Sequence, residues 1–273
     1  MVRVRYYDMR IPNWYRVQSG DIRVCKAWNL HSSGLVRHGY STRIGGLNMS
    51  LAVGDDRDSV LENRRAFASV IGVDAGRIVV PDQVHSDVVT VVNESDAGAG
   101  AFDHSSAVPD ADALITNTPN LPLALHFADC GCVFLVDPEN KAIGIAHAGW
   151  RGTALKIVQA TIKAMEREFG SDPQNMLAAI APAIGRCCYE VGEDTAKELF
   201  KAFLHDERVL RQISSNKWRA DIKTANHILL LEAGLKDMNI AVSEECTSCN
   251  GEEFFSYRRD GNTGRMSGWL SLV

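Results

Sequence analysis

Short runs of apolar and β-branched residues, each bounded by Gly, Pro, Asp or Asn, recur along the chain. Runs of this length predict strands, and their nearly continuous hydrophobicity favours strands that are buried on both faces of a sheet. Sheets of this kind need other elements to cover them. The expected strands are residues 23–28, 77–80, 88–92, 121–127, 132–136 and 141–146.

Apolar residues at helical spacing lie between some of these strands. The clearest stripe starts near Thr153 and stops before Gly170 and Pro173, two residues that are typical of helix ends. Its apolar positions are Leu155, Val158, Ile162, Met165 and Phe169. Further helices are expected at residues 58–71, 193–205 and 222–233.

The C-terminal tail carries a turn signal at Asp260-Gly261-Asn262 and is expected to form paired strands at residues 253–258 and 265–273. No internal repeat or low-complexity tract divides the chain. Hydrophobic residues make up 45% of the 273, which is enough for a packed core. The sequence therefore predicts a single domain, residues 1–273, of the α/β (α+β) class, in which helices flank mixed β-sheets.

The charge pattern bears on partners and location. The net charge of -5 comes from 29 basic and 34 acidic residues without a long block of one sign. This pattern predicts neither a nucleic-acid nor a membrane partner. The segment Met1–Asp8 lacks the apolar run of a signal peptide, and no later stretch is long enough to span a bilayer. A cytoplasmic location is therefore expected.

Seven cysteines, an odd number, argue against a disulfide framework in a chain that has no secretion signal. The pair Cys246-x-x-Cys249 has no second CxxC motif to complete a zinc ribbon, and it lacks a thioredoxin-like context. The adjacent pair Cys187-Cys188 cannot point to one side of a strand. Both pairs are therefore interpreted as packing residues.

Signatures of several common enzyme classes are absent from the sequence. There is no Walker loop and no dinucleotide-binding GxGxxG, so ATP or NAD chemistry has no support. The motifs HExxH and GxSxG, which mark zinc proteases and α/β-hydrolases, are absent as well.

Three segments place a metal-binding side chain at the end of an expected strand: His85, Cys130 and His147. Strand ends are rigid and face clefts, so the three side chains could meet at one ion. Two imidazoles and a thiolate suit zinc, and three protein ligands leave a fourth position for water or substrate. Asp129 is then expected to orient the site or to accept a proton. Without a metal, Cys130 and His147 could form a nucleophile–base pair instead.

Two arginines are candidates for binding an anion. Arg43 precedes Gly45 and Gly46, which let backbone approach a ligand closely, and Arg151 lies in a glycine-containing loop before a helix. A solvated arginine on a tight surface turn is the alternative interpretation of Arg43.

These segments and others resemble one family, the YfiH family, whose members are also described as multicopper polyphenol oxidases or laccase-domain proteins and as purine nucleoside phosphorylases. The resemblance covers nearly the whole chain. Its matching segments are 39–43 with 45–46, 53–56, 62–64, 83–85, 111–113, 128–130, 147–152, 181–185, 187–192, 221–222 with Asn226, 246–247, 255–259 and 263–265.

The resemblance implies a layered αββα fold, related to that of a bacterial cytotoxic-factor deamidase. It also implies a zinc ion held at His85, Cys130 and His147. The implied reactions are phosphorolysis of adenosine, inosine, guanosine and methylthioadenosine, and deamination of adenosine. Arg43 and Asn48 fall in the segment that is expected to line the substrate site. This chain departs from the family pattern in its short loop after Gly46 and in Ser86, which replaces a usual glycine.

Other functions remain open at this point. A laccase-type polyphenol oxidase would use copper, which can replace zinc at nitrogen and sulfur ligands, but a four-copper mechanism needs many paired histidines. This chain has eight histidines and no His-x-His. Editing of peptidoglycan precursors by hydrolysis and a non-enzymatic binding role are further alternatives. The expected partners are a purine nucleoside and phosphate, and the chain is expected to be a monomer or a homodimer.

Overall fold

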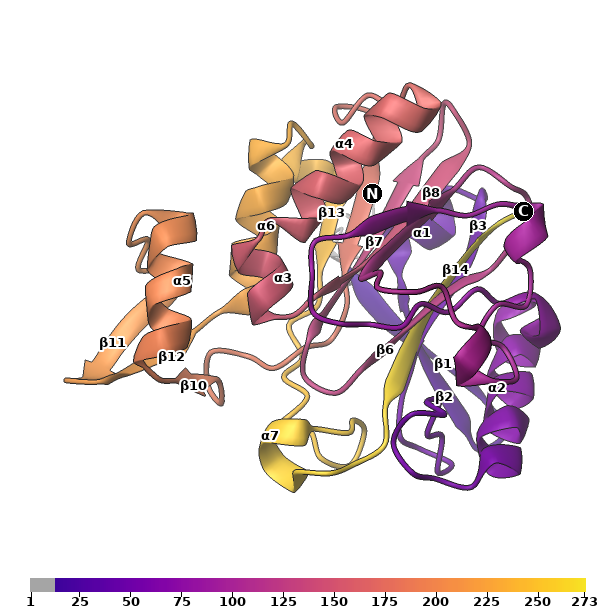
Figure 1. The fold of residues 1–273 in the computed structure, drawn as a ribbon, viewed down its shortest axis with the longest axis horizontal. Coiled ribbons are helices and arrows are strands. Elements are labelled where there is room, and N and C mark those ends of the chain that lie inside the picture. Colours follow the sequence, from indigo (N-terminus) through magenta and orange to yellow (C-terminus); the bar gives the residue numbers. More distant parts are fainter. Residues whose placement is uncertain (1–12) are drawn as a thin grey trace, which may run out of the picture.

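Two large β-sheets form the centre of the protein in the computed structural model, which describes residues 13–273 (Figure 1). The segment Met1–Asp8, used above to argue against a signal peptide, lies outside the described residues. The first sheet is antiparallel, in the order β1 (Trp14–Ser19), β2 (Ile22–Ala27), β3 (Val36–Ser41), β14 (Met266–Leu272) and β6 (Leu123–Phe127). The second is mixed, in the order β13 (Ile240–Val242), β9 (Leu177–Ile180), β7 (Gly131–Asp137), β8 (Ala142–Ala148), β5 (Ala113–Thr116) and β4 (Val89–Val91).

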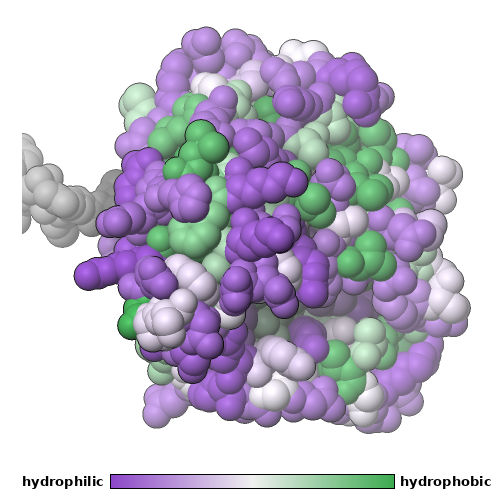
Figure 2. Space-filling view, turned by 60° about the vertical axis from the view of Figure 1, so that its left-hand side comes forward, coloured by the Kyte–Doolittle hydropathy of each residue, from purple (hydrophilic) through white to green (hydrophobic). Residues whose placement is uncertain are grey.

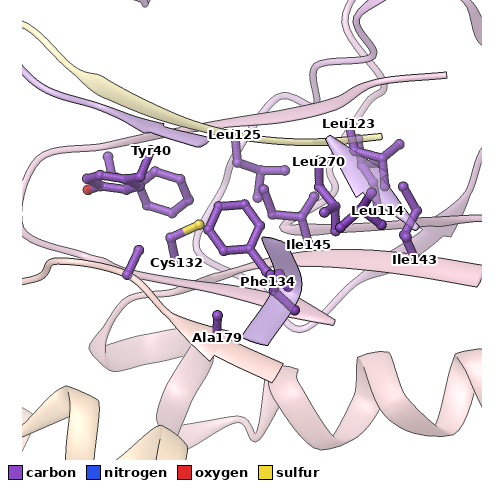
Figure 3. Close-up of a cluster of buried hydrophobic side chains, with 14 of the residues drawn as sticks. Tyr40, Leu114, Leu123, Leu125, Cys132, Phe134, Ile143, Ile145, Ala179 and Leu270 are labelled. Carbon is purple, nitrogen blue, oxygen red and sulfur yellow. The ribbon is translucent and has the colours of Figure 1, made fainter. Parts of the chain in front are cut away.

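Hydrophobic side chains of the two sheets pack face to face. Figure 3 shows Leu125 and Leu270 of the first sheet in one cluster with Phe134 and Ile145 of the second. All four side chains are fully buried, and such burial of apolar area is the main stabilising contribution to folding. Because residues in these strands are covered on both sides, the strands are nearly continuous in hydrophobicity, as the sequence predicts.

Helices cover the two outer faces. Helix α2 (Arg57–Ile71) packs on the first sheet, where the rings of Phe67 and Trp269 meet edge to face at 5.1 Å. Helix α4 (Ile157–Phe169) packs on the second sheet through Val158, Ile162 and Met165 of the predicted stripe, and α6 (Ile222–Glu232) packs there through Leu230. The first residue of the predicted stripe, Leu155, lies before α4 and is exposed. The order of layers is therefore αββα, and the predicted mixed α+β class is confirmed.

The remaining elements are short or peripheral. A third sheet, in the order β10 (Glu190–Val191), β12 (Lys217–Ala220) and β11 (Leu210–Ser214), packs with α5 (Glu193–Phe203) at the left of Figure 1. The other helices are α1 (Trp28–Ser32), α3 (Trp150–Ala154), α7 (Tyr257–Asp260) and the 3-10 turns Ala75–Arg77, Glu94–Asp96, His104–Ser106 and Asp237–Asn239.

The structure corrects the predicted tail. Residues 257–260 form α7 instead of a strand, because the Ser256 side chain accepts a hydrogen bond from the backbone N–H of Arg259 and starts a helical turn. Strand β14 pairs with β3 and β6 and not with residues 253–258. The segment at 77–80 makes only one isolated bridge, from Val79 to Leu123, instead of a full strand.

The helix expected from Thr153 is divided in two. Helix α3 ends at Ala154, and α4 begins at Ile157 after Lys156, whose φ of 65° lies in the left-handed region. A non-glycine residue in that conformation interrupts helical hydrogen bonding.

The surface in Figure 2 is largely hydrophilic, and its hydrophobic residues form small separate groups. Among residues 13–273, no helix combines the length and the apolar character needed to cross a membrane.

Candidate active site

The link between the two sheets brings the predicted residues together. Residues 128–130 cross from β6 in the first sheet to β7 in the second, and Asp129 takes a φ of 88° at this turn. Cys130 immediately precedes β7. His147 lies near the end of the neighbouring strand β8, opposite Cys132. Cys130 and His147 therefore lie side by side because their strands are neighbours in the sheet.

His85 completes a compact cluster of three side chains. One ligand atom each from His85, Cys130 and His147 lies within 4.8 Å of the other two. The two imidazole rings meet edge to face, with centroids 4.8 Å apart. The convergence predicted from the sequence is therefore present. The metal-binding role of the three residues stays a proposal.

The glycine at position 149 leaves space for this cluster. A Cβ atom there would lie 2.8 Å from Cys130 Sγ and 3.7 Å from His147 Nε2, so both atoms border the same spot. The short distance to sulfur excludes a larger residue without a shift of the cluster. The backbone at Gly149 is ordinary, with φ of -67°, so the need for glycine is steric.

The side chain of Asp112 fixes the positions of both histidines, His147 directly and His85 through its two neighbours. Its Oδ1 accepts a 2.7 Å hydrogen bond from His147 Nδ1, which leaves Nε2 free to face Cys130. Its Oδ2 accepts bonds from the backbone N–H groups of Val84 and Ser86, at 3.2 and 2.6 Å, and from the Ser86 hydroxyl at 2.9 Å. These bonds flank His85, whose φ of 63° is unfavourable for a non-glycine residue. A carboxylate behind a histidine is the usual support of a metal-binding imidazole.

The electrostatics of the cluster favour a thiolate. Burial raises the pKa of Cys130, but the charges and hydrogen bonds of His147 and His85 outweigh it and bring the pKa down to about 6. Burial likewise lowers the pKa of His147, yet Cys130 and Asp112 raise it to about 9. The pKa of Asp112 falls to about 2 despite its burial, because His147 and Ser86 donate to it. The metal-free cluster is therefore a pair of a Cys130 thiolate and a protonated His147. Thiolate is the metal-binding form of cysteine, whereas a metal ion at His147 would displace the proton on Nε2.

The cluster opens into a cavity of about 540 Å³, which is large enough for a small organic substrate. Its wall contains five of the residues singled out from the sequence: His85, Asp129, Cys130, His147 and Arg151. Sequence reasoning missed other polar and aromatic residues of the wall, which include Gln83, His104, His126, Tyr189, Tyr257, Arg258 and Arg265.

Two hydrogen bonds of the Gln83 side chain fix the backbone segment that leads to His85. Its side-chain amide accepts a 2.7 Å hydrogen bond from the backbone N–H of His126 and donates a 3.0 Å bond to the His126 carbonyl. The His126 ring is clamped in turn by Arg64 at 3.0 Å and by the Ser267 hydroxyl at 3.1 Å. Burial and then the Arg64 charge hold the pKa of His126 well below its usual value, so this imidazole is neutral.

Asp129 is fully engaged as an acceptor. Its Oδ1 accepts a 2.6 Å bond from the Thr247 hydroxyl. Its Oδ2 accepts bonds from the Ser256 hydroxyl at 3.0 Å and from the backbone N–H of Arg258 at 2.7 Å. Asp129 therefore positions the segment that carries Tyr257 and Arg258 into the cavity. Its expected role in proton transfer stays a prediction.

Two of the predicted substrate-binding residues do not form part of the cavity wall. Arg43 donates to the carbonyl of Gly251 at 3.1 Å, lies 3.7 Å from Asp260, and places its guanidinium over the Phe255 ring. Asn48 is buried. Its amide donates to Asp55, and its oxygen accepts from the backbone N–H of Arg265. Direct substrate contact by Arg43 and Asn48 therefore stays a prediction, and the bonds that the structure shows support the wall from behind.

The fold and the cluster define a class of layered α+β proteins in which two histidines and a cysteine that could hold a metal ion border a substrate-sized cavity. Residues 32–273 match the family model described as multi-copper polyphenol oxidoreductase laccase. The chain belongs to this family, as its resemblance to YfiH proteins predicts.

Several relatives cover most of the chain. It is 41% identical over 243 residues to purine nucleoside phosphorylase YlmD of Geobacillus stearothermophilus, which covers 85% of this chain and 88% of that protein. It is 35% identical over 231 residues to adenosine deaminase RL5 from an unknown prokaryotic organism, covering 84% and 86%. The crystal structure of Bacillus licheniformis hypothetical protein YfiH superposes with a TM-score of 0.88 at 37% identity, covering 95% of this chain and 99% of that one.

Proposed function

We propose that the protein is a zinc-dependent purine nucleoside phosphorylase that acts on adenosine, inosine, guanosine and methylthioadenosine. The observation that carries the proposal is the His85–Cys130–His147 cluster, which borders a cavity with three arginines in its wall. The name of a relative that shares 41% of its residues supports the same activity.

The donor set of the cluster fits zinc. Two imidazole nitrogens and one thiolate make three of four tetrahedral ligands and leave one position for a reactant. The fit is helped by the Asp112 bond to His147 Nδ1 and by the space at Gly149. A zinc ion bound there would supply Lewis acidity to a substrate atom.

The arginines of the wall would bind phosphate. Arg151, Arg258 and Arg265 bring three positive charges to one cavity, and guanidinium groups form paired hydrogen bonds with phosphate oxygens. Arg43 would act from outside the wall, since it contacts Gly251 and Asp260 on either side of the segment that carries Arg258. Tyr257 offers an aromatic ring for a purine base, as does Tyr189 on the face that Arg258 does not cover.

The reaction balances without an oxidant. A phosphate oxygen forms a bond to C1′ of the ribose, and the bond from C1′ to the base nitrogen breaks. The electron pair of that bond leaves with the base, which takes up a proton. Residues of the cavity wall would hold the phosphate and the nucleoside next to each other, and such positioning of two reactants lowers the entropic part of the barrier.

Adenosine deamination is a second activity that we propose for the same site. The 35% identity to a protein named adenosine deaminase supports it. Here water adds to C6 of the purine and ammonia leaves. The three-ligand cluster offers far fewer histidines than a four-copper oxidase requires, so copper-dependent polyphenol oxidation has no comparable structural support.

Incubation with each of the four nucleosides, with and without phosphate, tests the proposal. Hypoxanthine and ribose 1-phosphate should appear only with phosphate, and adenosine should also yield inosine. Cys130→Ala should lose both reactions and its zinc at this site. Cys25→Ala, which alters a buried cysteine outside the cluster, should keep them. Zinc-loaded wild-type protein that releases no base from any of the four nucleosides would refute the proposal.

A further inference from the structure

A second group of potential metal ligands lies outside the His–Cys–His cluster. The sulfur atoms of Cys187, Cys188, Cys246 and Cys249 all lie within 4.8 Å of one another. Cys249 Sγ is 3.4 Å from Cys187 Sγ and 3.3 Å from Cys188 Sγ. We propose that these four cysteines bind a second, structural zinc ion.

The sulfur spacing fits a metal and not a disulfide. A disulfide requires its two sulfurs about 2.05 Å apart. Zinc bonds to sulfur at about 2.3 Å, so the sulfurs of a tetrahedral site lie about 3.8 Å from one another. The observed separations of 3.3 and 3.4 Å need only small shifts to reach that arrangement.

The sequence interpretation of these cysteines as packing residues fits the buried Cys246 but not Cys187 and Cys249. Cys187 and Cys249 are exposed, so they do not fill the core. Cys187 and Cys188 are not on a strand, where they would point in opposite directions. A turn surrounds them, in which the N–H groups of Cys188 and Tyr189 both donate to the carbonyl of Gly185 at 3.0 Å. This turn lets two adjacent cysteines reach the same partner.

The backbone around the sulfurs is arranged for thiolates. The N–H of Gly185 donates to Cys246 Sγ at 3.2 Å, and such bonds stabilise a charged sulfur. A Cβ at Gly185 would lie 3.2 Å from Cys187 Sγ and 3.2 Å from Cys246 Cβ, so a larger residue would crowd the group. The buried ammonium of Lys223 donates to the carbonyls of Ser243 and Glu245, directly before Cys246. It places a positive charge beside a site that carries a net negative charge when four thiolates bind Zn²⁺.

The four cysteines join two segments that are far apart in the chain and that both reach the cavity. Tyr189 follows Cys188 and lines the cavity. Thr247 follows Cys246 and donates to Asp129, the neighbour of Cys130. The second zinc would therefore fasten one wall of the cavity. It would act as a closed site with four protein ligands and no position for substrate.

Metal content measured on the purified full chain tests the proposal independently of any activity. Wild-type protein should hold about two zinc ions, and His85→Ala and Cys249→Ser should each hold about one. Cys25→Ala should keep both, since Cys25 is buried elsewhere. X-ray absorption at the zinc edge of His85→Ala should show four sulfur ligands at about 2.3 Å.

Each contrary outcome is decisive. A His85→Ala protein without zinc, or with zinc bound by nitrogen and oxygen, overturns the proposal. So does a Cys249→Ser protein that keeps two zinc ions, or an intact mass showing that the four cysteines form disulfides. If Cys249→Ser does not fold, the spectrum of His85→Ala decides alone. An active wild-type enzyme whose single zinc ion is absent from Cys130→Ala and present in Cys249→Ser would overturn the second site and leave the proposed activity intact.

Discussion

Replacement of Asp112 by Asn should weaken zinc binding at the His85–Cys130–His147 cluster and lower activity with it. The carboxylate accepts four hydrogen bonds, from His147 Nδ1, the N–H groups of Val84 and Ser86, and the Ser86 hydroxyl. An amide of the same shape offers only one accepting oxygen. Neither orientation of the amide can therefore replace the carboxylate.

The two orientations fail for different reasons. If the amide oxygen faces His147, its NH₂ group opposes the backbone N–H groups that flank His85, and the strained φ of 63° at His85 loses its support. If the NH₂ group faces His147, the imidazole must carry its proton on Nε2, the atom that faces Cys130. In the first orientation the backbone N–H groups lose their acceptor, and a buried donor without a partner costs about 1–3 kcal/mol.

The expected loss follows from these costs. Removal of the hydrogen-bond partner of a metal-binding histidine typically lowers metal affinity by about 10–100-fold, which corresponds to about 1.4–2.7 kcal/mol. Zinc affinity should be measured by competition with a chromogenic chelator, and kcat/KM with inosine and phosphate should fall in parallel. Asp110→Asn is the matched control, because it makes the same change at an exposed position two residues away. Asp112→Asn protein that folds and binds zinc within twofold of this control would refute the reasoning.

Three further predictions concern the space at Gly149, the positive charge of Arg265 and the buried imidazole of His38. Gly149→Ala places a Cβ 2.8 Å from Cys130 Sγ and should lower zinc affinity about tenfold in the same competition assay; unchanged affinity would show that the cluster has room to move. Arg265→Ala should raise the KM for phosphate about tenfold or more with a smaller change for inosine, and an equal change for both would argue against a phosphate contact. Burial lowers the pKa of His38 from 6.5 to about 3, so between these values the unfolded chain binds more protons than the folded one. The free energy of unfolding should therefore fall by up to about 1.4 kcal/mol per pH unit as the pH drops below 6.5, and His38→Gln should reduce this slope in urea titrations; equal slopes in both proteins would contradict the assignment.

The layers of the fold could be predicted because local patterns of hydrophobic residues determine their strands and helices. The expected strand at 132–136 lies within β7, and the apolar stripe covers the second sheet from Val158 onward as part of α4. Strand β3 was missed because Arg37 and His38 interrupt its hydrophobic run. His38 is nevertheless buried, and its ring accepts a hydrogen bond from the N–H of Ala27. That bond joins residues of different strands, so no local pattern predicts it.

The residues of the candidate site likewise fall into those that the sequence predicts and those that only the fold brings together. The meeting of His85, Cys130 and His147 could be predicted because their residue types are chemically distinctive and each follows an expected strand, and the family resemblance implies the same three residues. Arg258 and Arg265 were missed because arginines near a chain end look like solvated surface until the fold brings them to a cavity.

The cysteine group shows why sequence spacing is a weak guide to metal sites formed by distant segments. Cys187-Cys188 and Cys246-x-x-Cys249 each lack a complete motif, and each was therefore interpreted as packing. Strand β9 and the parallel strand β13 beside it lead the two segments to the same end of the second sheet, where Ala183 and Cys246 form an isolated bridge. Two incomplete halves thus make one set of four sulfurs only because the strands before them are neighbours. The same pairing of neighbours, β7 with β8, brings Cys130 to His147, so sheet order brings together the four cysteines and two of the three side chains of the other cluster.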